Sequence, residues 1–251
     1  MKKEIDIFFT ALMFYTRIPC PSNITHDPDY LNKATRYFPL MGWIVGGIAS
    51  FVFWMSSYVF NPSICILLSM VASILTTGAF HEDGWADVCD GFGGGWTKEK
   101  ILEIMKDSRT GAYGAIGIAL MLLFKYVVQT EIPVALLCLT MIAAHSFSRL
   151  SAVGMVASSI YVRENEDAKA KPLAKTISIR EIIPAVIFGA APLLLIGKYS
   201  IGILLPILLT LYMRRYFHKW IGGYTGDCLG AIQQVTELMF YLGILAAWKF
   251  I

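Results

Sequence analysis

The sequence predicts an all-α, polytopic integral membrane protein, a helical bundle with six to eight transmembrane helices and seven as the best value. Two observations lead to this class. The chain of 251 residues is 56% hydrophobic and 16% charged, whereas a soluble domain is nearer half apolar and a quarter charged. The charged residues also cluster, and the apolar runs between them approach the roughly 20 residues that a membrane-spanning helix needs.

Seven apolar runs are candidate spans in one membrane-embedded domain, residues 1–251. A shorter run, Ile5–Ile18, is too short to cross a bilayer comfortably, so we expect an interfacial helix within a cytoplasmic N-terminal segment, residues 1–39. The fifth and sixth spans are short, and only residues 198–200 join them, which also allows a tight helical hairpin. The candidate spans are Leu40–Phe60, Ile64–Phe80, Ala112–Val128, Pro133–Ala157, Ile182–Gly197, Ile201–Met213 and Leu229–Trp248.

Basic residues occur in every second connection between these spans, while the turns Asn61–Ser63 and Gln129–Ile132 contain none. The positive-inside rule then places the basic segments and the N-terminus in the cytoplasm. With seven spans, the C-terminus would lie outside. The basic residues are Lys2, Lys3, Arg17, Lys33 and Arg36 before the first span, Lys98, Lys100, Lys106 and Arg109 after the second, Arg163, Lys169, Lys171, Lys175 and Arg180 after the fourth, and Arg214, Arg215 and Lys219 after the sixth.

Cysteine usage and net charge argue against other classes of protein. The five cysteines form no CxxC pair and are odd in number, so we expect neither a disulfide framework nor a zinc site. The net charge is +3. The sequence contains no basic stripe with interleaved aromatic residues, which is the pattern that would indicate binding of nucleic acid.

An acidic segment, residues 81–111, follows the second span and is the predicted catalytic segment. If the helix continues into it, Asp83, Asp87 and Asp90 fall within about 60° of one another on one face. Carboxylates at that spacing repel one another, and a divalent cation removes the conflict. An all-oxygen site suits Mg²⁺, with Mn²⁺ as an alternative, so we predict that these three aspartates bind the metal. Gly84 would leave space for a bulky ligand beside the backbone.

The residues that follow supply what a phosphate ester needs, which favours a site over a solvated acidic loop. A second predicted helix, Lys98–Asp107, carries Glu103 and Asp107 one turn apart, and either carboxylate can take a proton from an attacking hydroxyl. Which of them is the base stays open. Cations and hydroxyls beside a metal site hold the outer phosphate oxygens. The neighbouring candidates for that role are Lys106, Ser108 and Arg109.

Polar residues inside the spans are costly and therefore candidates for function. Arg149 would contact a substrate phosphate or pair with Glu237. Asp227, Gln234 and Glu237 share one face of the last span, and all three are candidate substrate contacts. Asp227 would otherwise bind metal or simply cap the helix, and Glu237 would otherwise pair with Arg149. Lys125 is expected to snorkel toward the outer interface.

His81 adjoins the acidic face at the start of the catalytic segment. On an ideal helix it points about 160° away from Asp83. This direction favours a contact with substrate over metal ligation.

Two strings resemble the signature of the cobalamin synthase family, the adenosylcobinamide-GDP ribazoletransferases. They are FHEDGWADVCDG at residues 80–91 and IMKDSRTGAYG at residues 104–114. Further similarity lies in FYTRIP at residues 14–19, in GGYTGDCLGA at residues 222–231 and at Phe38, Pro39, Gly42, Ser148 and Arg149. The similar stretches follow the family's order over nearly the whole chain. Lys219, a predicted substrate contact, stands where members of the family tend to have Arg, so a point charge replaces a fork that would grip a phosphate through two hydrogen bonds.

The resemblance implies a reaction and a location. Adenosylcobinamide-GDP would transfer its phosphorylated cobalt corrinoid to a ribose hydroxyl of α-ribazole or its 5′-phosphate. GMP leaves, and adenosylcobalamin or its 5′-phosphate forms, which completes the nucleotide loop in cobalamin biosynthesis. The family is Mg²⁺-dependent and lies in the bacterial inner membrane. Whether copies of the chain form a homo-oligomer stays open.

Two alternative functions share some of these features. A looser likeness to the CDP-alcohol phosphotransferases, at Asp87-x-x-Asp90-Gly91, leaves open a lipid-headgroup acceptor. A cation or metabolite transporter would use the acidic cluster as its ion site. Transporters usually hold such sites near the bilayer midplane within inverted repeats, and this sequence shows neither feature.

Overall fold

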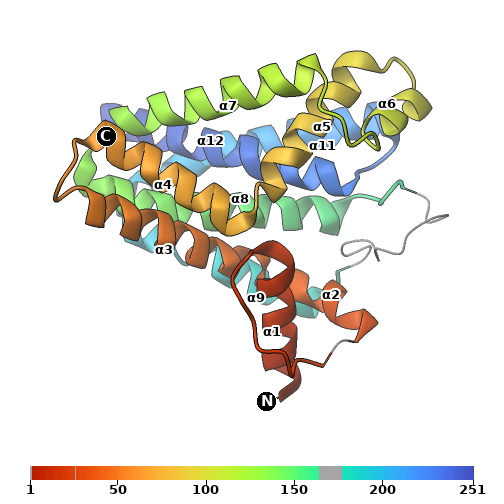
Figure 1. Cartoon of the computed structure of the whole chain (residues 1–251), viewed down its shortest axis with the longest axis horizontal. Helices are drawn as coiled ribbons and strands as arrows, with labels where there is room; N and C mark the ends of the chain where they lie inside the picture. Colours follow the sequence, from red (N-terminus) through yellow and green to blue (C-terminus); the bar gives the residue numbers. More distant parts are fainter. Residues whose placement is uncertain (1, 26, 164–176) are drawn as a thin grey trace.

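The long apolar runs form helices because a helix satisfies every backbone polar group within one segment, as a hydrocarbon environment demands. The computed structural model of the chain describes residues 2–25, 27–163 and 177–251, and these form a helical bundle (Figure 1). No strand occurs in this part of the chain, so the predicted all-α class is confirmed. Its long helices are α3 (Phe38–Ser56), α7 (Ala112–Glu131), α8 (Val134–Ser158) and α12 (Gly226–Phe250).

α12 is the central helix, and 15 of its 25 residues are buried. It packs against α5 (Phe80–Gly94), α7 and α8. It also packs against the two elements that precede it in the chain, η2 (Gly197–Ile203) and α11 (Leu204–Ile221). Glycine allows the closest of these approaches. A Cβ atom placed on Gly202 would lie 2.5 Å from the carbonyl carbon of Gly243 in α12.

The predicted second span ends at a corner. α4 (Pro62–Thr77) is followed by Gly78 and Ala79, which have φ values of 67° and 57°. This left-handed conformation, which Gly adopts without strain, ends the helix. α5 then starts at an angle of 88° to α4. The first part of the acidic segment is helical, as predicted, but it does not continue the axis of the span before it.

The N-terminal run forms α1 (Lys2–Tyr15), which lies across the long axis of the bundle in Figure 1. Arg36 holds it through an ion pair with Glu4 (Nη1–Oε2 3.3 Å), close to the short helix α2 (Pro28–Ala34). The predicted short helix is present, and its position at a membrane interface stays a prediction.

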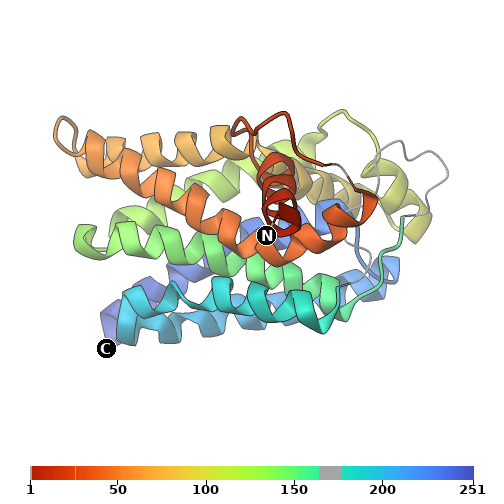
Figure 2. The same cartoon turned by 90° about the horizontal axis from the view of Figure 1, so that it is seen from below.

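The segment of the predicted fifth and sixth spans folds back on itself (Figure 2). Lys198 donates to the backbone oxygen of Ile251 at 3.0 Å, so the turn lies at the C-terminal end of α12. Arg214 donates to the carbonyl of Ser158 at 2.7 Å, so α11 returns to the opposite end. The elements of this hairpin are α9 (Ile179–Ala190), α10 (Leu193–Ile196), η2 (Gly197–Ile203) and α11 (Leu204–Ile221).

Five helical stretches of the described residues are long and apolar enough to cross a membrane, and the bent pair α4–α5 would be a sixth. One of the five is the 43-residue stretch Ile179–Ile221, which contains the hairpin. The predicted number of crossings, six to eight, thus depends on how often this stretch and the bent pair cross. The five stretches are Asp29–Ser56, Ala112–Glu131, Val134–Ser158, Ile179–Ile221 and Gly226–Phe250.

One end of the bundle, on the right in Figure 1, gathers the C-terminal ends of α5, α8 and α11 with the short helix α6 (Lys98–Ile104). The predicted basic connections after the second, fourth and sixth spans meet there. Three of their cations, Lys169, Lys171 and Lys175, lie outside the described residues.

The contact between α3 and α8 gives a test of the packing. A Cβ atom on Gly42 would lie 2.4 Å from the carbonyl oxygen of His145, so Gly42→Ala forces the two backbones apart. Overpacking costs about 1–3 kcal/mol, so we expect a melting temperature lower by about 2–10 °C in detergent. Gly47→Ala is the control because nothing lies within 4 Å of its Cβ position. Equal melting temperatures for the two variants would contradict this packing.

Candidate active site

The acidic face of α5 meets the start of α12 where two glycines let the backbones touch. A Cβ atom on Gly84 would lie 3.0 Å from the carbonyl oxygen of Asp227 and 3.3 Å from the Cα of Gly230. The space beside Gly84 is thus filled by α12, which corrects the expectation that it admits a ligand. Asp83 precedes Gly84, and Asp87 lies one turn after Asp83, so the close contact brings both toward Asp227.

Three carboxylates gather at this contact, and we call Asp83, Asp87 and Asp227 the carboxylate cluster. Asp83 is exposed, and the other two are partly buried. The Asp87 carboxylate is repelled by those of Asp227 and Asp83. Arg163 supplies a counter-charge, because its Nη2 lies 2.7 Å from Asp227 Oδ2 and 2.9 Å from the carbonyl oxygen of Met105.

Asp90, the third predicted metal ligand, has other partners. Its buried carboxylate accepts hydrogen bonds from the backbone N–H groups of Gly111 (2.7 Å) and Gly114 (2.8 Å) at the start of α7. A carboxylate at a helix N-terminus satisfies free N–H groups and complements the helix dipole. The structure therefore gives Asp90 a structural contact, and its role as a metal ligand stays a prediction.

As they stand, no three His, Cys, Asp or Glu side chains of the described residues form a group that could hold a metal ion. Proteins usually bind Mg²⁺ through one or two carboxylates together with water and substrate phosphates. The carboxylate cluster offers oxygen donors of that kind, and it contains neither the imidazole nor the thiolate typical of a zinc site.

The second predicted helix is shorter than expected, because α6 ends at Ile104. Glu103 is exposed and pairs with Lys100 at 2.9 Å. Asp107 accepts hydrogen bonds from the Arg109 side chain, at 2.6 Å from Nη2, and these lower the pKa of Asp107 to about 2. The same pairing raises the pKa of Arg109. No hydrogen bond or ion pair among the described residues joins these groups to the carboxylate cluster.

Three further predicted substrate contacts lie at the surface of the same end of the bundle. Lys106 and Ser108 are exposed in the connection between α6 and α7. Lys219 is exposed near the end of α11, with its Nζ 5.7 Å from the centre of the Trp220 ring. All three have room to reach a substrate.

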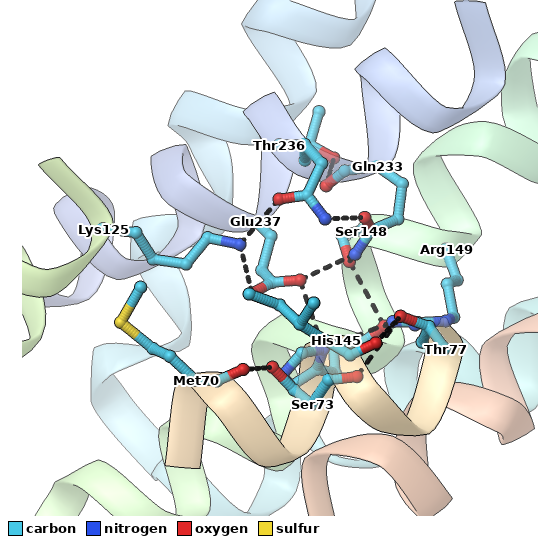
Figure 3. A network of polar contacts seen from close by, with 12 residues as sticks. Met70, Ser73, Thr77, Lys125, His145, Ser148, Arg149, Gln233, Thr236 and Glu237 are labelled. Atoms are coloured by element: carbon cyan, nitrogen blue, oxygen red, sulfur yellow. Dashed lines mark hydrogen bonds and ion pairs between the residues drawn. The ribbon is translucent and has the colours of Figure 1, made fainter. Parts of the chain in front are cut away.

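A buried polar network surrounds Glu237 in the middle of the bundle (Figure 3). Lys125 is 5% exposed, and its Nζ lies 3.0 Å from Glu237 Oε1 and 2.8 Å from Gln234 Oε1. The other Glu237 oxygen accepts a hydrogen bond from Gln233 at 2.6 Å and lies 3.2 Å from His145 Nδ1. The expectation that Lys125 snorkels to the outer interface is wrong, because Glu237 gives its charge a partner inside.

This network reaches the acidic helix. Gln234 donates to Glu82 Oε1 at 2.9 Å, next to Asp83 in the sequence. Arg149 is 1% exposed and donates to the carbonyl of His145 at 2.8 Å, so it joins the network without a direct ion pair to Glu237. Gln234, Glu237 and Arg149 thus connect α12 and α8 to α5. A substrate would reach them only if these helices separated.

His81 is also internal. It is 2% exposed and stacks on Phe38, with the rings inclined at 15° and their centres 5.7 Å apart. It therefore faces away from the carboxylate cluster, as the helical spacing predicts, and its contact with substrate stays a prediction.

The sequence predicted no contact for Arg163, which served only as one of the basic residues that indicate membrane topology. Its position depends on a short backbone pairing, in which Val162 donates to the carbonyl of Tyr224 (3.0 Å) and Tyr224 donates to that of Ile160 (2.9 Å). This pairing joins the end of α8 to the start of α12 and carries Arg163 to Asp227. No local pattern announces a contact between residues so far apart in the chain.

Known proteins that are similar in sequence identify the family of this chain. A family model described as cobalamin-5-phosphate synthase matches residues 7–245. The chain belongs to the cobalamin-5-phosphate synthase family. It is 44% identical to the adenosylcobinamide-GDP ribazoletransferase of Shewanella frigidimarina over 253 residues, which cover 97% of this chain and 95% of that protein. It is 42% identical to the protein of the same name from Leptospira interrogans over 260 residues, 99% of this chain and 98% of that one. No solved structure matches.

The buried network predicts a specific pattern of stability. Lys125→Met leaves Glu237 without its lysine partner, and breaking a buried pair in this way costs about 3–5 kcal/mol. The double variant Lys125→Met/Glu237→Gln removes both charges, so we expect most of the lost thermal stability to return. Melting temperatures of the purified variants test this. A double variant less stable than Lys125→Met would contradict the pairing.

Proposed function

We propose that this chain is a membrane phosphotransferase that joins adenosylcobinamide-GDP to α-ribazole, or its 5′-phosphate, with release of GMP. The observation that carries the proposal is the convergence of Asp83 and Asp87 with Asp227 at the α5–α12 contact. Relatives named adenosylcobinamide-GDP ribazoletransferase, 42–45% identical over nearly the whole chain, support the choice of substrates.

Mg²⁺, with Mn²⁺ as an alternative, is the proposed cofactor. The carboxylate cluster would hold the ion, which when bound neutralises charge on the bridging oxygens of the donor's diphosphate. Asp90, the third predicted ligand, also accepts hydrogen bonds from the start of α7, and its carboxylate caps that helix.

The chain's own residues must also handle a proton and the outer phosphate oxygens. The acceptor's ribose hydroxyl attacks the phosphorus that carries the corrinoid, the bond from that phosphorus to the GMP oxygen breaks, and the hydroxyl proton passes to a base. Asp107 and Glu103 are the candidates. With a pKa of about 2, Asp107 is a weak base while Arg109 holds it. We propose that Arg109 turns to a phosphate and so raises the basicity of Asp107.

We further propose that the site faces the cytoplasm from the inner membrane. The N-terminal end of α12 and the C-terminal end of α5 lie at the end of the bundle where the basic connections gather (Figure 1). The positive-inside rule places such an end in the cytoplasm, where the two nucleotide substrates would be available.

The reaction gives a direct test. In detergent or nanodiscs, the purified protein should release GMP from adenosylcobinamide-GDP only when α-ribazole and Mg²⁺ are both present, and EDTA should stop the reaction. Turnover of a CDP-alcohol instead would indicate a lipid-headgroup transferase. Solute flux in proteoliposomes without GMP release would favour the transporter.

Single variants test the carboxylate cluster. Asp83→Asn or Asp87→Asn should lower the rate of GMP release at least roughly 100-fold, because a metal that stabilises transition-state charge loses a ligand. The variants should still insert in the membrane and elute as the wild type does. Glu99→Gln, an exposed acid in the first turn of α6, is the matched control and should keep the normal rate. If either aspartate variant keeps a near-normal rate, that aspartate is not a metal ligand.

A further inference from the structure

We propose that Arg163 is an exchangeable counter-ion of the carboxylate cluster. It binds Asp227 while no divalent cation is present, and it turns to the phosphates of the nucleotide donor when a cation takes Asp227. This inference rests on the proposed function and adds a positioning residue that has so far had no role in it.

The contacts of Arg163 show a guanidinium that is only partly used. Nη2 is shared between Asp227 Oδ2 at 2.7 Å and the carbonyl oxygen of Met105 at 2.9 Å. Nε is buried and has no hydrogen-bond partner among the described residues. A buried donor without a partner is costly, so the free edge of this guanidinium is suited to a further acceptor.

The Asp227 oxygen that Arg163 binds is one of the donors that the carboxylate cluster would offer to a metal. Asp227 Oδ2 also lies 3.4 Å from the hydroxyl of Thr225, so two protein groups already contact it. A divalent cation at the carboxylate cluster would compete with the guanidinium for this oxygen and would also repel its charge. Arg163 therefore supplies at Asp227 the positive charge that a bound cation would supply.

A phosphate is the better partner for a displaced arginine. The planar fork of a guanidinium binds two phosphate oxygens at once, and such charge-assisted pairs are about twice as strong as neutral hydrogen bonds. The donor brings a diphosphate to the same cation. The exchange thus couples the arrival of the metal and the donor to the release of Asp227 from Arg163.

The backbone just before Arg163 is held in place by pairing, so the exchange would proceed by movement of the side chain. The pairing of Ile160 and Val162 with Tyr224 anchors the chain just before Arg163. A cavity of about 470 Å³, lined in part by Tyr161, Arg163 and Ile177, adjoins the guanidinium and gives it room.

Binding of Mn²⁺ alone, followed by electron paramagnetic resonance on the full-length protein without substrates, tests the first half of the exchange. Competition of this kind is a coupling, and couplings are typically about 5- to 150-fold. Arg163→Gln should therefore bind Mn²⁺ at least about fivefold more tightly than the wild type. Its KM for adenosylcobinamide-GDP should rise by about tenfold or more, because a charge-assisted contact to the donor's phosphates is lost. If the role of Arg163 were purely structural, the variant would bind both Mn²⁺ and the donor less tightly.

Two further variants make the result specific. Arg163→Lys keeps the charge but loses the fork, so Mn²⁺ affinity should stay near the wild-type value while the KM for the donor still rises. Arg214→Gln is the matched control, because Arg214 lies at the same end of the bundle and binds the carbonyl of Ser158 instead of a carboxylate. The Mn²⁺ affinity and the KM for adenosylcobinamide-GDP should both be unchanged in Arg214→Gln.

The outcomes separate this inference from the proposed function. If the wild type turns over but Arg163→Gln binds Mn²⁺ no more tightly than the wild type, the exchange is wrong and the transferase proposal stands. If the wild type releases no GMP with both substrates present, the transferase proposal fails, and the donor half of the exchange fails with it.

Discussion

α5 and α12 touch backbone to backbone where Gly84 faces Asp227 and Gly230 faces the carbonyl of His81. The rest of the site depends on this contact. It sets two carboxylates of α5 beside the first turn of α12, although like charges at this spacing repel each other. A larger residue at either glycine would separate the helices and relieve that repulsion. The packing therefore maintains a concentration of negative charge that would attract a divalent cation.

The buried network gives α12 a fixed position along α5. Lys125 and Arg149 carry positive charge, and Glu82 and Glu237 carry negative charge, so the ionised network is neutral overall. Isolated charges in an apolar interior are expensive, whereas paired and hydrogen-bonded ones are tolerated. Gln234 joins the two halves, because its side chain accepts from Lys125 and donates to Glu82. Sliding of α12 along α5 would break these bonds and leave buried charges without partners.

Features that depend on neighbouring residues were predictable from the sequence. Apolar runs indicated the long helices, and the spacing of the acids indicated that Asp83 and Asp87 share a face of one helix. The shared face of Asp227, Gln234 and Glu237 was predictable for the same reason, since helical periodicity is a local property. Helix α1 and the hairpin between α9 and α11 were also visible as apolar runs too short to span alone.

Features that depend on distant contacts were not predictable. Asp90 has the spacing of a metal ligand, but Gly111 and Gly114 lie over 20 positions further on and offer free N–H groups. Lys125 resembles an interfacial lysine until Glu237 is placed opposite it. Arg163 reaches Asp227 only because the chain pairs at Tyr224. In each case a long-range partner decides what a polar side chain does.

The rate of GMP release by Gly84→Leu tests the central claim most directly. A Leu side chain at this position must push α5 away from Asp227, and misplacement by about 1 Å can cost roughly 100-fold in rate. Gly154→Leu is the control, because nothing lies within 4 Å of its Cβ position. We expect Gly84→Leu to insert and elute normally yet lose about 100-fold or more in rate. A wild-type rate in Gly84→Leu would contradict the claim that the α5–α12 contact assembles the active site.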